Sequence, residues 1–109
     1  MDAKTEGHLQ AMAAALGASA GQPLCLRFEV NGDPEGVRFV DTSSGTALAK
    51  AAPEGRKLDG LLRLDAAIAA RLAQRSLTFR EALRTQAVVF AGDLSVLPAL
   101  ERAFAQTVS

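Results

Sequence analysis

The chain has 109 residues, a length that suits one domain with one hydrophobic core. Its 12 basic and 12 acidic residues cancel, and no run of Lys or Arg forms a stripe that would neutralise phosphates, so we expect no nucleic-acid partner. The chain has one cysteine, no apolar run of the roughly 18 residues of a membrane span, and no signal-peptide pattern at its N-terminus. We therefore expect a soluble, cytoplasmic domain with no integral membrane span.

The first predicted element is a helix over residues 5–16. Leu9, Met12 and Leu16 are spaced so that they share one helical face. Gly17 follows at a position where helices commonly end, and we expect the helix to stop there.

Two segments with alternating polarity then predict a β-hairpin. In residues 24–30 one set of side chains points to one side, and Cys25 lies on the opposite, polar side. The second segment, V-R-F-V-D from Val37, places Val37 and Phe39 together on one face. We expect Phe39 and Phe28, from the first segment, to face one interior.

The middle of the chain is the hardest part to interpret. Residues 43–56 include T-A-L-A-K-A-A, which fits a third strand or a short helix; we favour a weak strand. The next segment, K-L-D-G-L-L-R-L, places Leu58, Leu62 and Leu64 on one side and predicts another strand.

A helix over residues 65–75 is predicted next, because Asp65 is a good N-cap residue and Ile68 and Leu72 lie one turn apart. A second, short helix over residues 79–84 is predicted by a capping box.

In that capping box, the Thr78 hydroxyl and the Glu81 carboxylate each satisfy a free backbone N–H. Residues 87–91 are an uninterrupted apolar run, which predicts a strand in the interior of the sheet. Gly92 and Asp93 then turn the chain.

The last predicted helix begins near Ser95, with Pro98 in its first turn, where no backbone N–H is needed. Leu97, Leu100 and Phe104 line one face of this helix. The element order indicates an α+β domain with an antiparallel or mixed sheet.

The sequence contains no arrangement typical of a catalytic or metal site. His8 is the only histidine, and one His with one Cys is too few ligands for a metal. Cys25 has no nearby base in the sequence, and the acidic residues are scattered singly. We therefore expect no enzyme activity, no metal and no cofactor.

What remains is a set of large apolar side chains that either fill the core or surround an apolar cavity. Helices rich in alanine leave gaps against a sheet unless large residues oppose them, and apolar gaps accept apolar ligands. The candidate ligand-binding residues are Phe28, Phe39, Ile68, Leu72, Phe79, Leu83, Val88, Phe90, Leu97, Leu100 and Phe104.

Five stretches of the sequence together resemble the sterol carrier protein type 2 family of lipid-binding domains. They are L-R-F-E-V from Leu26, L-L-R-L-D-A-A-I-A-A-R-L from Leu61, L-T-F-R-E-A-L-R-T from Leu77, A-V-V-F-A-G-D from Ala87 and L-P-A-L-E-R-A-F from Leu97. The likeness extends over residues 23–104, so we treat residues 1–109 as one domain with an N-terminal helix and connector (1–22), this core, and a tail (105–109).

The resemblance implies a sheet of about five strands, helices on one of its faces, and an apolar tunnel between them. It implies a non-catalytic carrier of a fatty acyl, sterol-like or isoprenoid ligand. The alternative is an accessory module with a filled core, which forms a homodimer or assists an enzyme of lipid or quinone metabolism.

Overall fold

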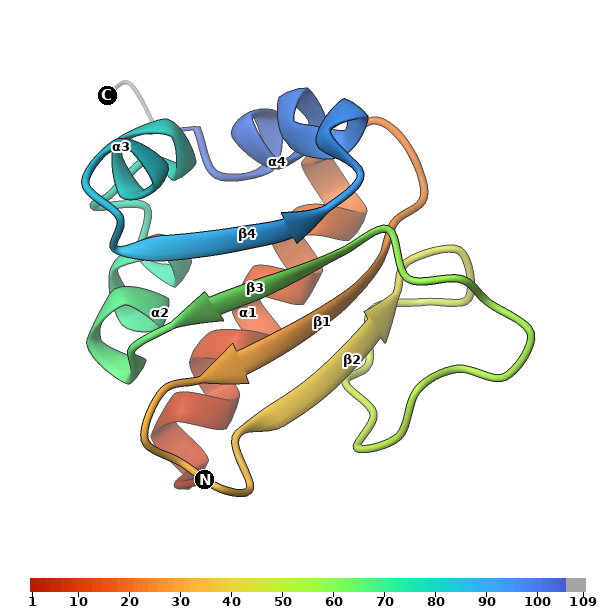
Figure 1. The fold of residues 1–109 in the computed structure, drawn as a ribbon, viewed down its shortest axis with the longest axis horizontal. Helices are drawn as coiled ribbons and strands as arrows, with labels where there is room; N and C mark the ends of the chain where they lie inside the picture. Colours follow the sequence, from red (N-terminus) through yellow and green to blue (C-terminus); the bar gives the residue numbers. More distant parts are fainter. Residues whose placement is uncertain (106–109) are drawn as a thin grey trace.

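The computed structural model describes residues 1–105, and its elements follow the predicted order of helix, strands, two helices, strand and helix (Figure 1). Residues 106–109, the end of the predicted tail, lie outside the described part of the chain. The elements are α1 (Ala3–Ser19), β1 (Cys25–Val30), β2 (Val37–Asp41), β3 (Gly60–Leu64), α2 (Ala66–Ala73), α3 (Phe79–Arg84), β4 (Val88–Gly92), the 3-10 turn η1 (Leu94–Val96) and α4 (Leu97–Ala103).

The four strands form one mixed sheet in the order β2-β1-β3-β4. β1 pairs parallel with β3, and the other two pairings are antiparallel. The helices lie on one face of the sheet, with α1 crossing behind the strands, while the other face carries no helix (Figure 1). The predicted α+β class with a mixed sheet is confirmed, with four strands rather than five.

The position of a fifth strand is taken by a single β-bridge in residues 42–59. Ala49 exchanges two backbone hydrogen bonds of 2.8 Å with Phe39, on the free edge of β2. The weak strand predicted in this segment is therefore reduced to one bridged residue. Leu58 precedes β3 and is 37% exposed, so it does not join Leu62 and Leu64 on the core face.

The predicted hairpin of β1 and β2 is confirmed, but the predicted orientation of Phe39 is wrong. The register pairs Phe39 with Arg27, and Phe28 with Arg38. Directly opposed residues project to the same side, so Phe39 lies on the open face, where the Arg27 guanidinium is 5.7 Å from its ring centroid. A change of register by one residue exchanges the two faces of a strand, and alternation within one strand does not fix that register.

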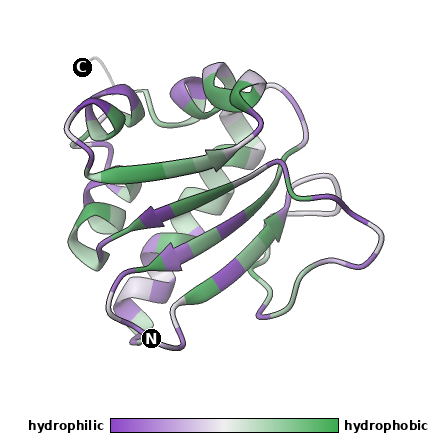
Figure 2. Cartoon of the chain, in the orientation of Figure 1, coloured by the Kyte–Doolittle hydropathy of each residue, from purple (hydrophilic) through white to green (hydrophobic). Residues whose placement is uncertain are grey.

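β4 was predicted in the interior of the sheet, and that prediction is wrong. The strand lies at an edge, next to β3 only, and Val89 is 51% exposed. Figure 2 shows β4 as nearly all hydrophobic, whereas β1 and β3 alternate. Edge strands usually carry charge that discourages pairing with other chains, so the apolar run alone suggested an interior position.

One core joins the whole described chain, including the first helix. Leu9, Met12 and Leu16 of α1 are at most 1% exposed and pack with buried residues of the sheet and of α4. The helix continues through Gly17 to Ser19 because nothing in its second half breaks the hydrogen-bonding pattern. The apolar face of α1 is therefore part of the core.

The helix starts agree with the sequence at Thr78 and differ at Asp65. The Thr78 hydroxyl accepts a hydrogen bond of 3.1 Å from the backbone N–H of Glu81, which is one half of the predicted capping box. The other half is not formed, because the Glu81 carboxylate accepts from the Arg84 guanidinium instead of from the Thr78 backbone N–H. Asp65 occupies the N-cap of α2, but its carboxylate accepts from the side chain of Asn31 at 3.0 Å and makes no cap bond. The last helix begins at Leu97, after η1, slightly later than predicted.

Candidate functional site

The structure brings ten of the eleven candidate apolar residues to the helix-covered side of the sheet or into the helices that cover it; Phe39 is the exception. Six of the ten are at most 2% exposed: Phe28, Leu72, Phe79, Val88, Leu100 and Phe104. Four are partly buried and pack against these: Ile68, Leu83, Phe90 and Leu97. The fully buried members fill the space between sheet and helices.

α3 and α4 meet through two contacts of different character. Phe79, at the start of α3, stacks on Phe104, at the end of α4, with ring centroids 6.1 Å apart and an angle of 28° between planes. In the second contact, the Arg80 guanidinium lies 3.2 Å from the Glu101 carboxylate. One aromatic pair and one exposed ion pair hold the two helices together at this point.

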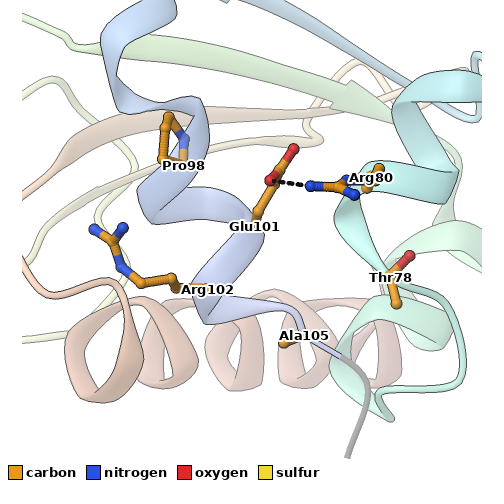
Figure 3. A pocket seen from close by; sticks show the side chains of 6 residues that line it. All are labelled: Thr78, Arg80, Pro98, Glu101, Arg102 and Ala105. Carbon is orange, nitrogen blue, oxygen red and sulfur yellow. Dashed lines mark hydrogen bonds and ion pairs between the residues drawn. The ribbon is translucent and has the colours of Figure 1, made fainter.

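A groove of about 520 Å³ lies between these two helices. Its lining residues are Thr78, Arg80, Pro98, Glu101, Arg102 and Ala105. Figure 3 shows Arg80 of α3 and Glu101 of α4 pointing toward one another across it. This volume lies within the range of about 300–1,000 Å³ that is usual for small-molecule sites.

Arg102 fixes one side of the groove to the first helix. Its Nε and Nη2 atoms donate hydrogen bonds of 3.1 and 2.7 Å to the carbonyl oxygen of Ala20, the residue after α1. This double contact holds α4 against α1 and orients the guanidinium. The lining therefore carries two guanidinium groups and one carboxylate.

None of the eleven predicted ligand-binding residues lines this groove, and sequence reasoning missed its members. Thr78 was singled out only as a helix cap. A signal was present in α4, where Pro98, Glu101, Arg102 and Ala105 are spaced i, i+3, i+4 and i+7 and so share one face beside the apolar face. The spacing of these residues shows that they share one face of α4. It does not show that this face lies next to α3.

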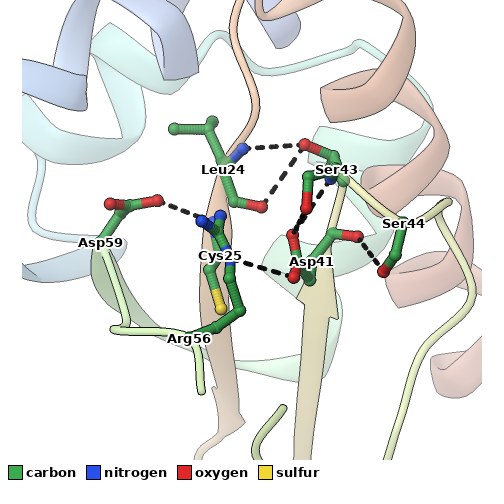
Figure 4. A network of polar contacts seen from close by, with 8 residues as sticks. Leu24, Cys25, Asp41, Ser43, Ser44, Arg56 and Asp59 are labelled. Atoms are coloured by element: carbon green, nitrogen blue, oxygen red, sulfur yellow. Dashed lines mark hydrogen bonds and ion pairs between the residues drawn. The ribbon is translucent and has the colours of Figure 1, made fainter. Parts of the chain in front are cut away.

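A second polar cluster surrounds Cys25 at the start of β1 (Figure 4). The Asp59 carboxylate accepts from the Cys25 backbone N–H at 2.8 Å, and the Asp41 carboxylate accepts from Ser43 and from Arg56 at 2.6 and 3.0 Å. Burial raises the pKa of the Cys25 thiol, and its side chain is fully buried. The cluster attaches residues 42–59 to the sheet, and burial disfavours the thiolate form of Cys25.

The bonds from Ser43, together with the nearby Arg56, lower the pKa of the Asp41 carboxyl.

Within residues 1–105, no three His, Cys, Asp or Glu side chains gather in an arrangement that would hold a metal ion. In the same range, no helix has the length and hydrophobicity needed to span a bilayer.

Comparison of the structure with solved structures finds several sterol carrier proteins. A sterol carrier protein-2 like-3 from Aedes aegypti is 15% identical, with a TM-score of 0.65 over 94% of this chain and 98% of its own. The chain has the sterol carrier protein 2 fold. No protein-family model matches the sequence, and no curated protein matches it.

Two further structures with this fold carry informative names. Palmitated SCP2L2 from Aedes aegypti is 17% identical, with a TM-score of 0.59 over 96% of each chain. A UbiJ-SCP2 ubiquinone synthesis protein is also 17% identical, with a TM-score of 0.53 over 87% of this chain and 73% of its own. At these identities the likeness establishes the sterol carrier protein 2 fold and not a shared ligand.

Proposed function

We propose that this domain binds a single-chain hydrophobic molecule, a fatty acyl or isoprenoid chain, which enters at the groove between α3 and α4. The groove carries the proposal, because it is a hollow of about 520 Å³ between two of the helices that cover the sheet. The stacked, buried Phe79 and Phe104 are next in the chain to the lining residues Thr78, Arg80 and Ala105. Buried apolar side chains therefore adjoin the residues that line a surface opening.

Entry of a chain requires Phe79 and Phe104 to separate, since both side chains are at most 1% exposed. Partly buried neighbours such as Leu97 and Leu83 already pack against the core and offer side chains that can move. Each methylene group removed from water contributes about 0.8 kcal/mol, so six buried methylenes supply about 5 kcal/mol toward this rearrangement. Chain length then determines affinity more than any polar contact does.

The sterol carrier protein 2 fold supports the proposal, and the name of the palmitated Aedes aegypti protein gives an example of an acyl ligand on that fold. No catalytic or metal chemistry enters the proposed function. The domain acts as a carrier or presenter of its ligand.

The test is to fill the groove without changing the core. Ala105 is exposed and lines the groove, and Ala14 is an exposed residue of α1 outside it. We expect the wild-type protein and Ala14→Trp, incubated with mixed fatty acids, fatty alcohols and isoprenoid alcohols, to release stoichiometric ligand into organic solvent. For Ala105→Trp, mass spectrometry should find an amount of extracted ligand about tenfold or more below that of the wild-type protein, because the indole occupies the volume that the ligand chain needs.

Equal ligand content in Ala105→Trp and Ala14→Trp would contradict the groove as the entry point. An empty extract from all three proteins would contradict ligand binding itself. In that case the second function becomes the better one: an accessory module that associates with itself or with an enzyme.

Two observations favour that second function. The core is filled by side chains such as Phe28 and Leu100, which are fully buried, and the uncharged edge strand β4 lacks a neighbour within the described chain. Free edges with no charge are able to pair with strands of another chain. The same fold occurs in the neighbour named UbiJ-SCP2 ubiquinone synthesis protein.

A further inference from the structure

Two positively charged side chains lie next to each other at the edge of β2 that does not pair with β1. Ala49 and Phe39 exchange two backbone hydrogen bonds in an antiparallel bridge, which places Lys50 opposite Arg38. Directly opposed residues project to the same side, and like charges there repel each other. Within residues 1–105, Lys50 forms no ion pair that would offset its charge.

Arg38 is a buried guanidinium with hydrogen-bonding capacity left over. The residue is 6% exposed, and its Nη1 atom donates to the carbonyl oxygens of Glu35 and Val37 at 2.9 and 2.8 Å. Its Nε atom has no hydrogen-bond partner in the described chain, although the Glu6 carboxylate lies 3.5 Å away. In the same part of the chain, Nη2 makes no hydrogen bond either. Because buried charged groups are usually paired and hydrogen-bonded, this guanidinium has room for another acceptor.

Both cations line a hollow of about 360 Å³ at this edge of the sheet. Its other lining residues are Pro34, Glu35 and Val37. Among the described ion pairs, none joins the Glu35 carboxylate to either cation, so the chain does not itself bridge them. The formal charges of Arg38, Lys50, Glu35 and the nearby Glu6 cancel, and the hollow therefore attracts an anion through directed donors and not through net charge. It shares no lining residue with the α3–α4 groove.

We propose that this hollow binds the phosphate group of a small, soluble phosphate monoester. Arginine presents a rigid fork of donors that matches phosphate oxygens, and lysine adds a mobile point charge. The phosphate accepts hydrogen bonds from Nη2 of Arg38 and from the Lys50 ammonium group, and its negative charge relieves the repulsion between them. Because Arg38 is recessed, the site suits a small molecule and not the flat surface of a bilayer. This site goes beyond the function proposed above and does not depend on it.

The experiment titrates nitrogen-15-labelled protein with glycerol 3-phosphate at constant ionic strength, and with glycerol as the neutral counterpart. We expect saturable amide shifts in residues 34–38 and 49–51 with glycerol 3-phosphate and none with glycerol. Lys50→Gln should weaken the binding of glycerol 3-phosphate about fivefold, because one of the two cations is lost. Glu35→Gln should strengthen it about threefold, because a carboxylate that opposes the anion is removed.

Lys57→Gln is the matched control. Lys57 is an exposed lysine in the same segment, residues 42–59, and does not line the hollow. We expect this variant to bind glycerol 3-phosphate with wild-type affinity. Lys50 and Glu35 are exposed as well, so their substitution leaves the core intact and no variant of the buried Arg38 is needed.

The absence of saturable shifts with glycerol 3-phosphate, or equal shifts with glycerol, would overturn the proposal. Equal weakening by Lys50→Gln and Lys57→Gln would also overturn it, because the anion would then respond only to overall charge. Vesicles of phosphatidylcholine and phosphatidate present the same phosphate group on a membrane. Binding to these vesicles without binding of glycerol 3-phosphate would contradict the small-molecule assignment. Each of these outcomes leaves the proposed binding of an apolar chain intact.

Discussion

Gly92 ends β4 with a backbone conformation that other residues rarely adopt. Its φ is 136°, and a Cβ atom added there would lie 2.6 Å from both the Asp59 carbonyl oxygen and the Gly60 Cα. Both are backbone atoms, so a side chain at this position cannot be accommodated by a rotamer change. The sequence predicted a turn at this glycine, and the structure explains why the residue must be glycine.

We expect Gly92→Ala to lower the free energy of unfolding by about 1–3 kcal/mol, the usual cost of a strained backbone residue. Urea unfolding followed by circular dichroism measures the change. Gly7→Ala is the matched control, since Gly7 lies inside α1 with no atom within 4 Å of an added Cβ. That variant should gain about 0.5–1 kcal/mol because alanine favours a helix. Equal effects from the two substitutions would contradict the steric explanation.

At the scale of elements, the first helix contributes to the core and to the groove, although the resemblance to the sterol carrier family did not include it. Because that likeness began at residue 23, the sequence interpretation kept α1 apart from the sterol-carrier-like core of residues 23–104. The periodicity of Leu9, Met12 and Leu16 nevertheless predicted an apolar face correctly, and the structure buries all three. The helix also positions the groove, because Arg102 of α4 is bonded to the residue that follows α1.

We therefore expect Leu9→Ala to lower the free energy of unfolding by about 2–5 kcal/mol, as for other fully buried leucines. Lys4→Ala, on an exposed position of the same helix, should change it by less than about 0.5 kcal/mol. Thermal and urea unfolding of both variants test this. A small effect of Leu9→Ala would mean that α1 is separable from the core.

Other features of the elements differ in how far the sequence determines them. The core faces of β1 and β3, and the Thr78 cap of α3, follow from local spacing and are confirmed. The face of Phe39 and the edge position of β4 depend on strand register and strand order, which involve residues far apart in the chain. Local patterns carry no information about either, so both predictions were wrong.

At the scale of the whole molecule, the sheet and helices form a closed core, with an open sheet face and a groove between α3 and α4. The groove arises where α3 and α4 meet, and it depends on how two short helices pack against each other. The α+β class was predictable from the element order, and the apolar residues below the groove were predictable from their spacing. The polar rim was not, because Arg80 and Glu101 become neighbours only after folding.

The entry of an apolar chain between α3 and α4 is the central claim, and backbone amide chemical shifts test it most directly. Uniformly nitrogen-15-labelled protein would be titrated with dodecanol, a probe that depends on no charged residue. We predict saturable shifts concentrated in residues 78–84 and 97–105, with little change at Arg27, Val37 or Phe39 on the open face of the sheet. Shifts centred on that open face, or no shifts at saturating probe, would contradict the claim.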